Sequence, residues 1–258
     1  MRDIEWMSKL LNGRSPALFD AVKLEKITKP KVLDLFCGAG GATKGYQNLG
    51  YYVVGVDHKW QPNYCGDMFI QAEALSWLQD NIEFVKEQFV AVHASPPCQA
   101  YTTGVDPYIR NNYPKLVEPT RDALIDADIH YIIENVAGYY TGLIDPIMLC
   151  GSTFGLRVRR HRLFETDFPV KQPECDHKWQ DDSPVFITYH QYRWSWRGTV
   201  GVHSNGGSTG NAKAYWPWAM GMGDTWDDCW MTPYELTQAI PPAYTQYVGS
   251  YIPEYARR

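Results

Sequence analysis

The stretch KVLDLFCGAGG, residues 31–41, is a run of apolar residues that ends in a glycine-rich turn. Three more short apolar runs follow it along the chain: YVVGVD (52–57), FVAVHAS (89–95) and YIIENV (131–136). Runs of this length are typical of buried strands, and the residues between them have the apolar spacing of helices. Strands that alternate with helices build a doubly wound sheet. We therefore predict an α/β fold with a mainly parallel sheet.

The residues that stand out chemically all follow one of these predicted strands. They are Phe36 to Gly41, Asp57, Ser95 to Gln99, and Glu134 with Asn135. In open α/β sheets, ligands bind at the carboxyl ends of the strands. The sequence therefore predicts one functional site at that edge of the sheet.

The composition limits the class of protein. A chain of 258 residues can bury a large core without disulfides, and a net charge of −5 argues against binding nucleic acid through overall charge. The opening residues, MRDIEWMSKLLNGR, lack the apolar region of an export signal, and no apolar run approaches the ~20 residues of a membrane span. The six cysteines lack the spacing of a disulfide framework. We expect a soluble, cytoplasmic protein with reduced cysteines.

Positive charge and aromatic residues gather in the second half of the chain. No Asp or Glu occurs from 183 to 223, where Arg193, Arg197 and Lys213 stand among tyrosines and tryptophans. The stretch RVRRHR (157–162) lies upstream. This combination is typical of a surface that contacts phosphates and bases. The alternative is a β-rich subdomain whose aromatic side chains form a small core.

The glycine turn and the second strand indicate a cofactor. Gly38, Gly40 and Gly41 let the backbone approach a ligand at a strand-to-helix turn. Asp57 ends the next strand, where a carboxylate can accept hydrogen bonds from both ribose hydroxyls. The alternative is a structural turn followed by a surface acid. Because the glycine spacing differs from G-x-G-x-x-G, we favour S-adenosylmethionine over a dinucleotide.

Four blocks, in this order, resemble the signature blocks of the DNA cytosine-5 methyltransferase family: DLFCGAGG (34–41), PPCQ (96–99), ENV (134–136) and RRHRLF (159–164). The compact layout is similar to that of short members encoded by bacteriophages. The resemblance extends to FIQAEAL (69–75), like the block with an acid near the cofactor's adenine, and to ELTQAIPPAYTQYVG (235–249), like the closing helix. It implies the Rossmann-like fold of S-adenosylmethionine-dependent methyltransferases with a small target-recognition subdomain.

The resemblance implies a catalytic role for four residues. Cys98 is the nucleophile that adds to carbon 6 of cytosine and makes carbon 5 reactive, and positive charge nearby is expected to favour its thiolate. Glu134 hydrogen-bonds ring nitrogen 3 and the exocyclic amine. Arg162 holds the cytosine carbonyl, and Arg160 supports it.

The cofactor pocket implied by the resemblance consists of Phe36, Gly38, Gly40, Asp57, Glu73 and Pro97. Two departures from the family pattern stand out. Glu73 replaces the more common aspartate, and Thr237 with Gln238 replace the usual Gly-Asn pair of the closing block.

The expected organisation has four parts: an N-terminal extension (1–30), a catalytic and cofactor-binding domain (31–164), a small target-recognition region (165–229) and a C-terminal segment (230–258) that returns to the catalytic domain. The expected partner is double-stranded DNA, bound by a monomer that flips its cytosine out of the stack. The loop from Tyr101 to Pro119 is interpreted as a mobile lid, the alternative being an ordinary surface loop. The candidate DNA contacts are Gln99, Arg110, Arg193, Arg197 and Lys213.

Two other functions remain open. A branch of the family with near-identical blocks modifies tRNA, and a relative that lost catalysis would still bind DNA, although the intact Cys98, Glu134 and Arg162 speak against the latter. No metal is expected, because Cys175 and His177 have a C-x-H spacing that lacks a second pair of ligands.

Overall fold

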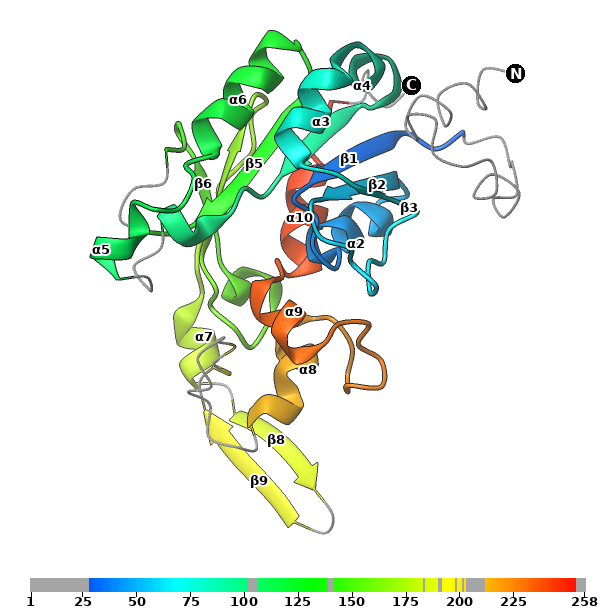
Figure 1. Cartoon of the computed structure of the whole chain (residues 1–258). Helices are drawn as coiled ribbons and strands as arrows, with labels where there is room; N and C mark the ends of the chain where they lie inside the picture. The colour runs from blue at the N-terminus through cyan, green and yellow to red at the C-terminus, as the bar shows by residue number, and fades with distance from the viewer. Residues whose placement is uncertain are drawn as a thin grey trace.

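The computed structural model (Figure 1) describes residues 28–101, 106–138, 142–182, 184–189, 192–197, 199–200, 202 and 212–253. Of 184–189 and 192–197 it describes the backbone alone. The predicted N-terminal extension, 1–30, lies outside the described residues except for 28–30. No helix in the described ranges is long and apolar enough to cross a membrane.

A seven-stranded sheet with the order β3-β2-β1-β4-β5-β7-β6 forms the centre of the described structure. The strands β1 to β5 run parallel, and β7 pairs antiparallel with both β5 and β6. The predicted doubly wound, mainly parallel sheet is therefore confirmed. The strands are β1 (Lys31–Leu35), β2 (Tyr52–Asp57), β3 (Met68–Gln71), β4 (Ala91–Ala94), β5 (Tyr131–Val136), β6 (Ile147–Leu149) and β7 (Arg162–Thr166).

Helices cover both faces of this sheet. Side chains of α3 (Ala74–Asp80), α4 (Ile82–Gln88) and α6 (Val117–Asp126) share a core with one face, and side chains of α2 (Gly41–Asn48) and α10 (Pro242–Gly249) share a core with the other. Figure 1 shows α10, near the C-terminal end of the described chain, beside α2. The helices thus sandwich the sheet in three layers.

Strand side chains divide between the two cores with a period of two. Leu33 and Val54 pack in the core with α3 and α6, whereas Val32 and Val53 pack in the core with α2 and α10. Successive side chains of a strand point to opposite faces, so a continuous apolar run fills both cores. This is why the four apolar runs of the sequence became central strands.

The close contact between α2 and α10 depends on Gly45. A Cβ at this position would lie 2.1 Å from Thr245 Oγ1, closer than real Cβ atoms come to other heavy atoms. The Thr245 hydroxyl donates a hydrogen bond of 2.7 Å to the carbonyl oxygen of Ala42. The C-terminal helix is therefore fastened directly behind the glycine turn.

The remaining elements lie beyond the sheet. They include a two-stranded antiparallel pair, which Figure 1 shows projecting away from the main sheet. A third core contains Trp216 and Met220 from α8 together with Val158 and Leu236. Part of the aromatic, acid-free segment therefore packs into a core, which agrees with the alternative that its aromatic side chains form a small core. These elements are α5 (Pro107–Arg110), α7 (His177–Asp182), β8 (Pro184–Tyr189), β9 (Tyr192–Arg197), α8 (Trp216–Met220) and α9 (Pro233–Gln238), with the short 3-10 helices η2 (Cys98–Ala100), η3 (Gly151–Phe154) and η4 (Ala212–Tyr215).

Candidate active site

A cleft of about 280 Å³ lies at the carboxyl edge of the parallel strands. Its walls come from the last residues of β1, β2 and β5, from the turns after β1, β2 and β4, from the start of β7, and from the segment around α9. The structure brings together in it eight predicted site residues: Phe36, Gly38, Asp57, Pro97, Cys98, Gln99, Glu134 and Arg162.

The turn after β1 presents its backbone to this cleft. Phe36 and Gly38 have φ angles of 61° and 51°, in the left-handed region that glycine adopts readily and other residues rarely. The N–H of Gly38 donates to Asp57 Oδ2 over 3.1 Å. The glycine turn and the end of β2 are thereby held together.

Gly40 has a packing role and does not line the cleft. Its φ is 90°, and a Cβ there would lie 2.8 Å from Cys65 Sγ. The sulfhydryl of Cys65 lies 3.2 Å from the carbonyl oxygen of Gly40, to which it donates. The φ angle and the close approach to Cys65 are therefore sufficient to require glycine at position 40, and its predicted contact with a cofactor stays a prediction.

Asp57 is held in position at the end of β2. Its side chain is buried, and its Oδ1 accepts a hydrogen bond of 2.9 Å from the N–H of Lys59. The same oxygen lies 3.3 Å from Nδ1 of the exposed His58. A carboxylate that is fixed here and faces the cleft can accept hydrogen bonds from ribose hydroxyls.

Asp34, which the sequence-based site did not include, also lines the cleft. It is fully buried, and one carboxylate oxygen accepts a hydrogen bond of 2.5 Å from the hydroxyl of Thr43. The other oxygen is buried without a hydrogen-bond partner. Burial raises the pKa of Asp34 to about 7. Because Asp34 lies inside a predicted strand, one residue before Leu35, the sequence pattern did not indicate that it would line a site.

Cys98 begins η2, directly after β4 and the two prolines. The side-chain amide of Asn135 donates to the carbonyl oxygen of Pro96 over 3.0 Å and so ties this turn to β5. Burial and the Glu134 carboxylate raise the pKa of the Cys98 thiol, and Arg162 and Arg160 only partly offset the rise. Positive charge therefore favours the thiolate as expected, but burial and Glu134 outweigh it in the protein without substrate.

Glu134 and Arg162 form an ion pair in the cleft. The Arg162 Nε lies 3.1 Å from Glu134 Oε1, and both side chains are largely shielded from solvent. Burial raises the pKa of Glu134, against the opposing effects of Arg162 and of a hydrogen bond from Ser95. A carboxyl group with a raised pKa retains its proton more readily and can act as a proton donor.

A chain of buried polar groups extends behind Glu134. The hydroxyl of Tyr46 in α2 lies 2.9 Å from His93 Nδ1, and His93 Nε2 lies 2.8 Å from the Ser95 hydroxyl, which hydrogen-bonds Glu134. Burial lowers the pKa of His93 to about 3, so the ring is neutral. If Ser95 donates to Glu134, His93 donates from Nε2 and accepts at Nδ1. The chain orients the Glu134 carboxyl from the far side of the cleft.

Arg160 contacts backbone carbonyl groups and does not line the cleft. Its guanidinium donates to the carbonyl oxygens of Thr237 (2.6 Å) and Ala239 (3.0 Å) at the C-terminal end of α9. The last carbonyls of a helix lack internal partners, and a cation there is favourable. Burial lowers the pKa of Arg160 to about 9. Arg160 therefore fastens the closing segment to the loop before β7.

Glu73 and Gln238 belong to the two blocks in which the sequence differs from the family pattern, and only Gln238 lines the cleft. Glu73 does not line the cleft, because its carboxylate caps α3 by accepting hydrogen bonds from the N–H groups of Leu75 and Ser76. Burial alone would raise the pKa of Glu73, but the hydrogen bonds from Ser76 reverse this and lower it. Gln238, in contrast, lines the cleft, so the closing block still presents a side-chain amide there.

The remaining predicted nucleic-acid contacts lie apart from the cleft. Arg110 ends α5, and Lys213 is exposed with its Nζ 5.6 Å from the centre of the Trp216 ring. Arg193 and Arg197 belong to β9, and their side chains lie outside the described residues. Of the predicted lid, 102–105 is likewise outside them.

Both anchors of that lid segment are fixed by Tyr101. Its buried hydroxyl accepts a hydrogen bond of 3.1 Å from the N–H of Val117, the first residue of α6. The middle of the segment forms α5, whose Tyr108 is 92% exposed. The described part therefore combines a fixed base with an exposed aromatic tip.

No family model matches the chain, and no curated protein does. Solved structures of methyltransferases are similar to it. One is an Escherichia coli prophage protein assigned as a DNA modification methyltransferase, at 20% identity and a TM-score of 0.43, covering 72% of this chain and 64% of that one. Another is the S. pombe Dnmt2 methyltransferase, at 16% identity and a TM-score of 0.48, covering 86% and 98%.

A third similar structure is a variant of Spodoptera frugiperda DNMT2, at 20% identity and a TM-score of 0.38, covering 56% of this chain and 53% of that one. The chain therefore spans less than two thirds of the prophage and insect proteins. Its own strand order, with the antiparallel β7, establishes the predicted Rossmann-like fold class.

Proposed function

We propose that this protein is an S-adenosylmethionine-dependent methyltransferase that modifies carbon 5 of cytosine in DNA. The observation that carries the proposal is the convergence of Cys98, Glu134 and Arg162 in the cleft that also contains Gly38 and Asp57. The reaction needs a nucleophile, a proton donor to the ring and a group that stabilises developing negative charge. The cleft offers one side chain for each of these tasks.

The residues around the glycine turn fit S-adenosylmethionine. Gly38 lies in the turn that opens onto the cleft, and an added Cβ would meet nothing within 4 Å, which leaves room for a ligand beside the backbone. Asp57 offers a carboxylate for the ribose hydroxyls, and Phe36 also lines the cleft. When bound, the cofactor supplies an electrophilic methyl group.

The residues of the cleft would act in sequence on the cytosine ring. Cys98 loses its proton to solvent water and its sulfur bonds to carbon 6, while Glu134 gives its proton to nitrogen 3. Arg162 keeps the Glu134 carboxyl in place and contacts the ring carbonyl. After carbon 5 has gained the methyl group, its proton leaves to water, the bond between carbon 6 and sulfur breaks, and the nitrogen 3 proton returns to Glu134.

Double-stranded DNA is the proposed substrate, bound by a monomer that flips the target cytosine into the cleft. The acid-free segment and the β8–β9 pair, which projects from the body of the protein, support this choice. Extruding a base costs a few kcal/mol, which contacts in the pocket offset. Lys213 and Trp216 of this region lie close enough for a cation–π contact.

The test is methyl transfer by the purified protein to duplex DNA and to tRNA, followed by mass spectrometry of the nucleosides. We expect 5-methylcytosine in the DNA. Product in tRNA alone would establish the RNA branch instead. Absence of product in both would favour the catalytically inactive relative.

Covalent catalysis is tested separately with Cys98→Ser. We expect this variant to lose detectable turnover because a hydroxyl is a much weaker nucleophile than a thiolate, while its circular dichroism and cofactor affinity stay close to those of the wild type. DNA that contains 5-fluorocytosine should trap the wild type, and not the variant, as a complex stable in denaturing gels. Full activity of Cys98→Ser would overturn the mechanism.

A further inference from the structure

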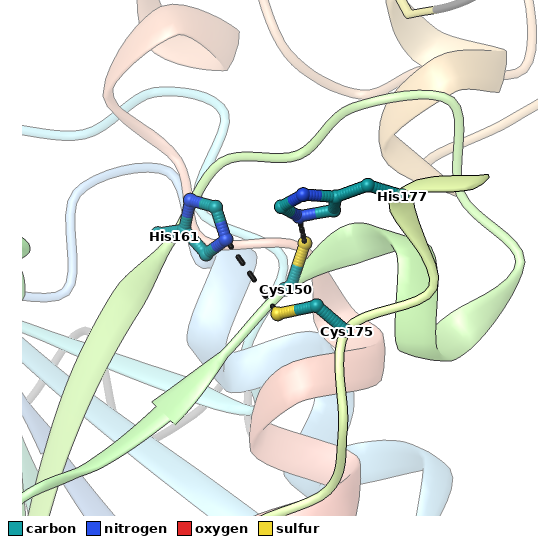
Figure 2. A group of neighbouring side chains, drawn as sticks. All are labelled: Cys150, His161, Cys175 and His177. Atoms are coloured by element: carbon teal, nitrogen blue, oxygen red, sulfur yellow. Dashed lines mark hydrogen bonds between the residues drawn. The ribbon is translucent and has the colours of Figure 1, made fainter. Parts of the chain in front are cut away.

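Four side chains with metal-binding atoms converge outside the cleft (Figure 2). Cys150 follows β6, His161 directly precedes β7, and Cys175 and His177 lie just before α7 and at its start. One ligand atom from each lies within 4.8 Å of the others. The expectation that Cys175 and His177 lack a second pair of ligands is therefore wrong, because folding brings Cys150 and His161 to them.

We propose that these four residues form a structural zinc site. Tetrahedral zinc binds sulfur at about 2.3 Å and nitrogen at about 2.0 Å, which places a sulfur and a nitrogen ligand about 3.5 Å apart. The Cys150 Sγ lies 3.3 Å from His177 Nε2, and the Cys175 Sγ lies 3.6 Å from His161 Nε2. Both distances match that separation, and the two pairs face one another around a common centre.

The donor set identifies the metal. Two thiolates and two imidazoles are the ligands of structural zinc sites, whereas calcium and magnesium prefer oxygen atoms. A Rieske iron–sulfur cluster has the same four donors but binds its cysteines and its histidines to two different irons. Here one ligand atom from each residue lies within 4.8 Å of the others, which fits a single ion. Four protein ligands complete a tetrahedron and leave no position for water, so the site stabilises structure and does not take part in the chemistry. Cys150 is buried, which limits access to the centre.

Hydrogen bonds around the cluster suit metal-bound thiolate. The Ser152 hydroxyl donates to Cys150 Sγ over 3.1 Å, and it accepts a hydrogen bond of 2.9 Å from the N–H of Asp176. The Thr153 hydroxyl donates to the carbonyl oxygen of Glu174 over 3.0 Å. Such outer contacts orient the ligands of metal sites. They also tie η3 to the two ligands near α7.

The zinc would fasten α7 to the segment before β7 and its first residue, where Arg160 and Arg162 lie. His161 stands between Arg160 and Arg162, so its anchoring fixes the backbone of both. The Gln180 amide, from the same helix, donates to the carbonyl oxygens of Leu156 (2.9 Å) and Val158 (3.1 Å). An effect of zinc on catalysis rests on the proposed function; the presence of the site does not.

The experiment measures zinc in protein purified from zinc-containing medium and dialysed against metal-free buffer. Inductively coupled plasma mass spectrometry should find close to one zinc per chain and no comparable iron or copper. Cys175→Ser and His177→Ala should lose the zinc. Cys229→Ser, a cysteine of intermediate exposure outside the cluster, is the matched control and should keep it.

A second measurement uses only wild-type protein, so it is informative even if a variant fails to fold. Wild-type protein refolded with cobalt(II) in place of zinc should show the intense visible bands of tetrahedral cobalt and a thiolate-to-metal charge-transfer band. No zinc in the wild type together with no such spectrum would overturn the proposal. So would unchanged zinc in Cys175→Ser, or a disulfide between Cys150 and Cys175 in the purified protein. Because neither readout involves methyl transfer, a failure of the zinc proposal can be distinguished from a failure of the proposed function.

Discussion

At the scale of single residues, the cleft shows how burial and neighbouring charge set the state of a reactive group. Burial raises the pKa values of both Cys98 and Glu134, and Arg162 opposes both shifts. Without substrate, the thiol therefore keeps its proton and the carboxyl group gains one more readily. In the proposed reaction, the nucleophile would therefore stay unreactive until a base enters the cleft.

The first prediction concerns the reactivity of the Cys98 thiol. Its pKa is raised, so its thiolate fraction is small near neutral pH and grows as the pH rises. Glu134→Gln removes a negative charge that raises this pKa and should speed alkylation by iodoacetamide. Arg162→Ala removes a positive charge that lowers it and should slow alkylation.

The measurement is the rate of modification of the Cys98 peptide as a function of pH, followed by mass spectrometry. Arg159→Ala serves as the control, because Arg159 pairs with Asp181 on the surface and should leave the rate unchanged. Equal rates in the Glu134 and Arg162 variants would mean that these charges do not act on the thiol.

The second prediction concerns the ribose contact of Asp57. Asp57→Ala removes a charged acceptor and should weaken S-adenosylmethionine binding by roughly 1.5–3 kcal/mol, measured by isothermal titration calorimetry. Asp57→Asn is the matched control, since its amide oxygen can still accept the hydrogen bond from Gly38 and should cost less. An unchanged affinity in Asp57→Ala would show that the cofactor lies elsewhere.

At the scale of elements, buried arginines hold segments together that the chain places far apart. Arg160 links the loop before β7 to the end of α9. Arg121 of α6 pairs with Glu165 of β7, with Nε 2.5 Å from Oε1 and Nη2 2.6 Å from Oε2. The same carboxylate accepts from the N–H of Ile144 over 2.7 Å. This pair fixes the antiparallel strand against the helix layer.

The third prediction is that Glu165→Ala strongly destabilises the fold. It leaves the Arg121 guanidinium buried without its carboxylate, which should cost about 3–5 kcal/mol in the free energy of unfolding. Chemical denaturation followed by circular dichroism measures this. Asp181→Ala breaks the exposed pair with Arg159 and should cost no more than about 1 kcal/mol. Similar losses in the two variants would contradict the reasoning.

At the scale of the whole molecule, the described chain has one core on each face of the sheet and a third beyond it. The third core joins Ala39 of the glycine turn to Trp216, Met220 and Leu236. The Trp230 indole also donates to the carbonyl oxygen of Ala39 over 2.9 Å. The segment proposed to read DNA therefore packs directly on the cofactor turn, and part of its aromatic surface is committed to this packing.

The fourth prediction is that the enzyme recognises a short or degenerate site of roughly two to four base pairs. Each base pair read needs about one good contact, worth about 1–3 kcal/mol of discrimination, and few side chains between Phe164 and Trp230 remain for this task. The burial of Trp216 reduces their number further. Methylation mapping of a treated genome measures the site. A strict six-base-pair motif from a monomer would mean that more side chains read bases than this segment supplies.

Local patterns were enough to predict much of the fold. The strands β2 and β5 coincide with the runs YVVGVD and YIIENV, and the glycine turn follows β1 as expected. The sequence pattern did not reveal β3, β6 or β7. The strand β6 spans only Ile147–Leu149, and β7 contains Arg162 and Glu165, whose charges interrupt an apolar run. Charge there is tolerated because each residue has a buried partner of opposite sign.

The sequence by itself determined the doubly wound sheet and the strand-end residues, because apolar periodicity and glycine turns are signals carried by neighbouring residues. Only the tertiary structure decided what those residues contact. It assigned Glu73 to a helix cap, directed Arg160 to the end of α9, and gathered Cys150, His161, Cys175 and His177 around one point. The contacts of Arg160 and of the four-residue cluster join segments that are far apart in the sequence, which no local spacing encodes. The Glu73 cap is local, to the N–H groups of Leu75 and Ser76, and competes with the cofactor role that the resemblance implied.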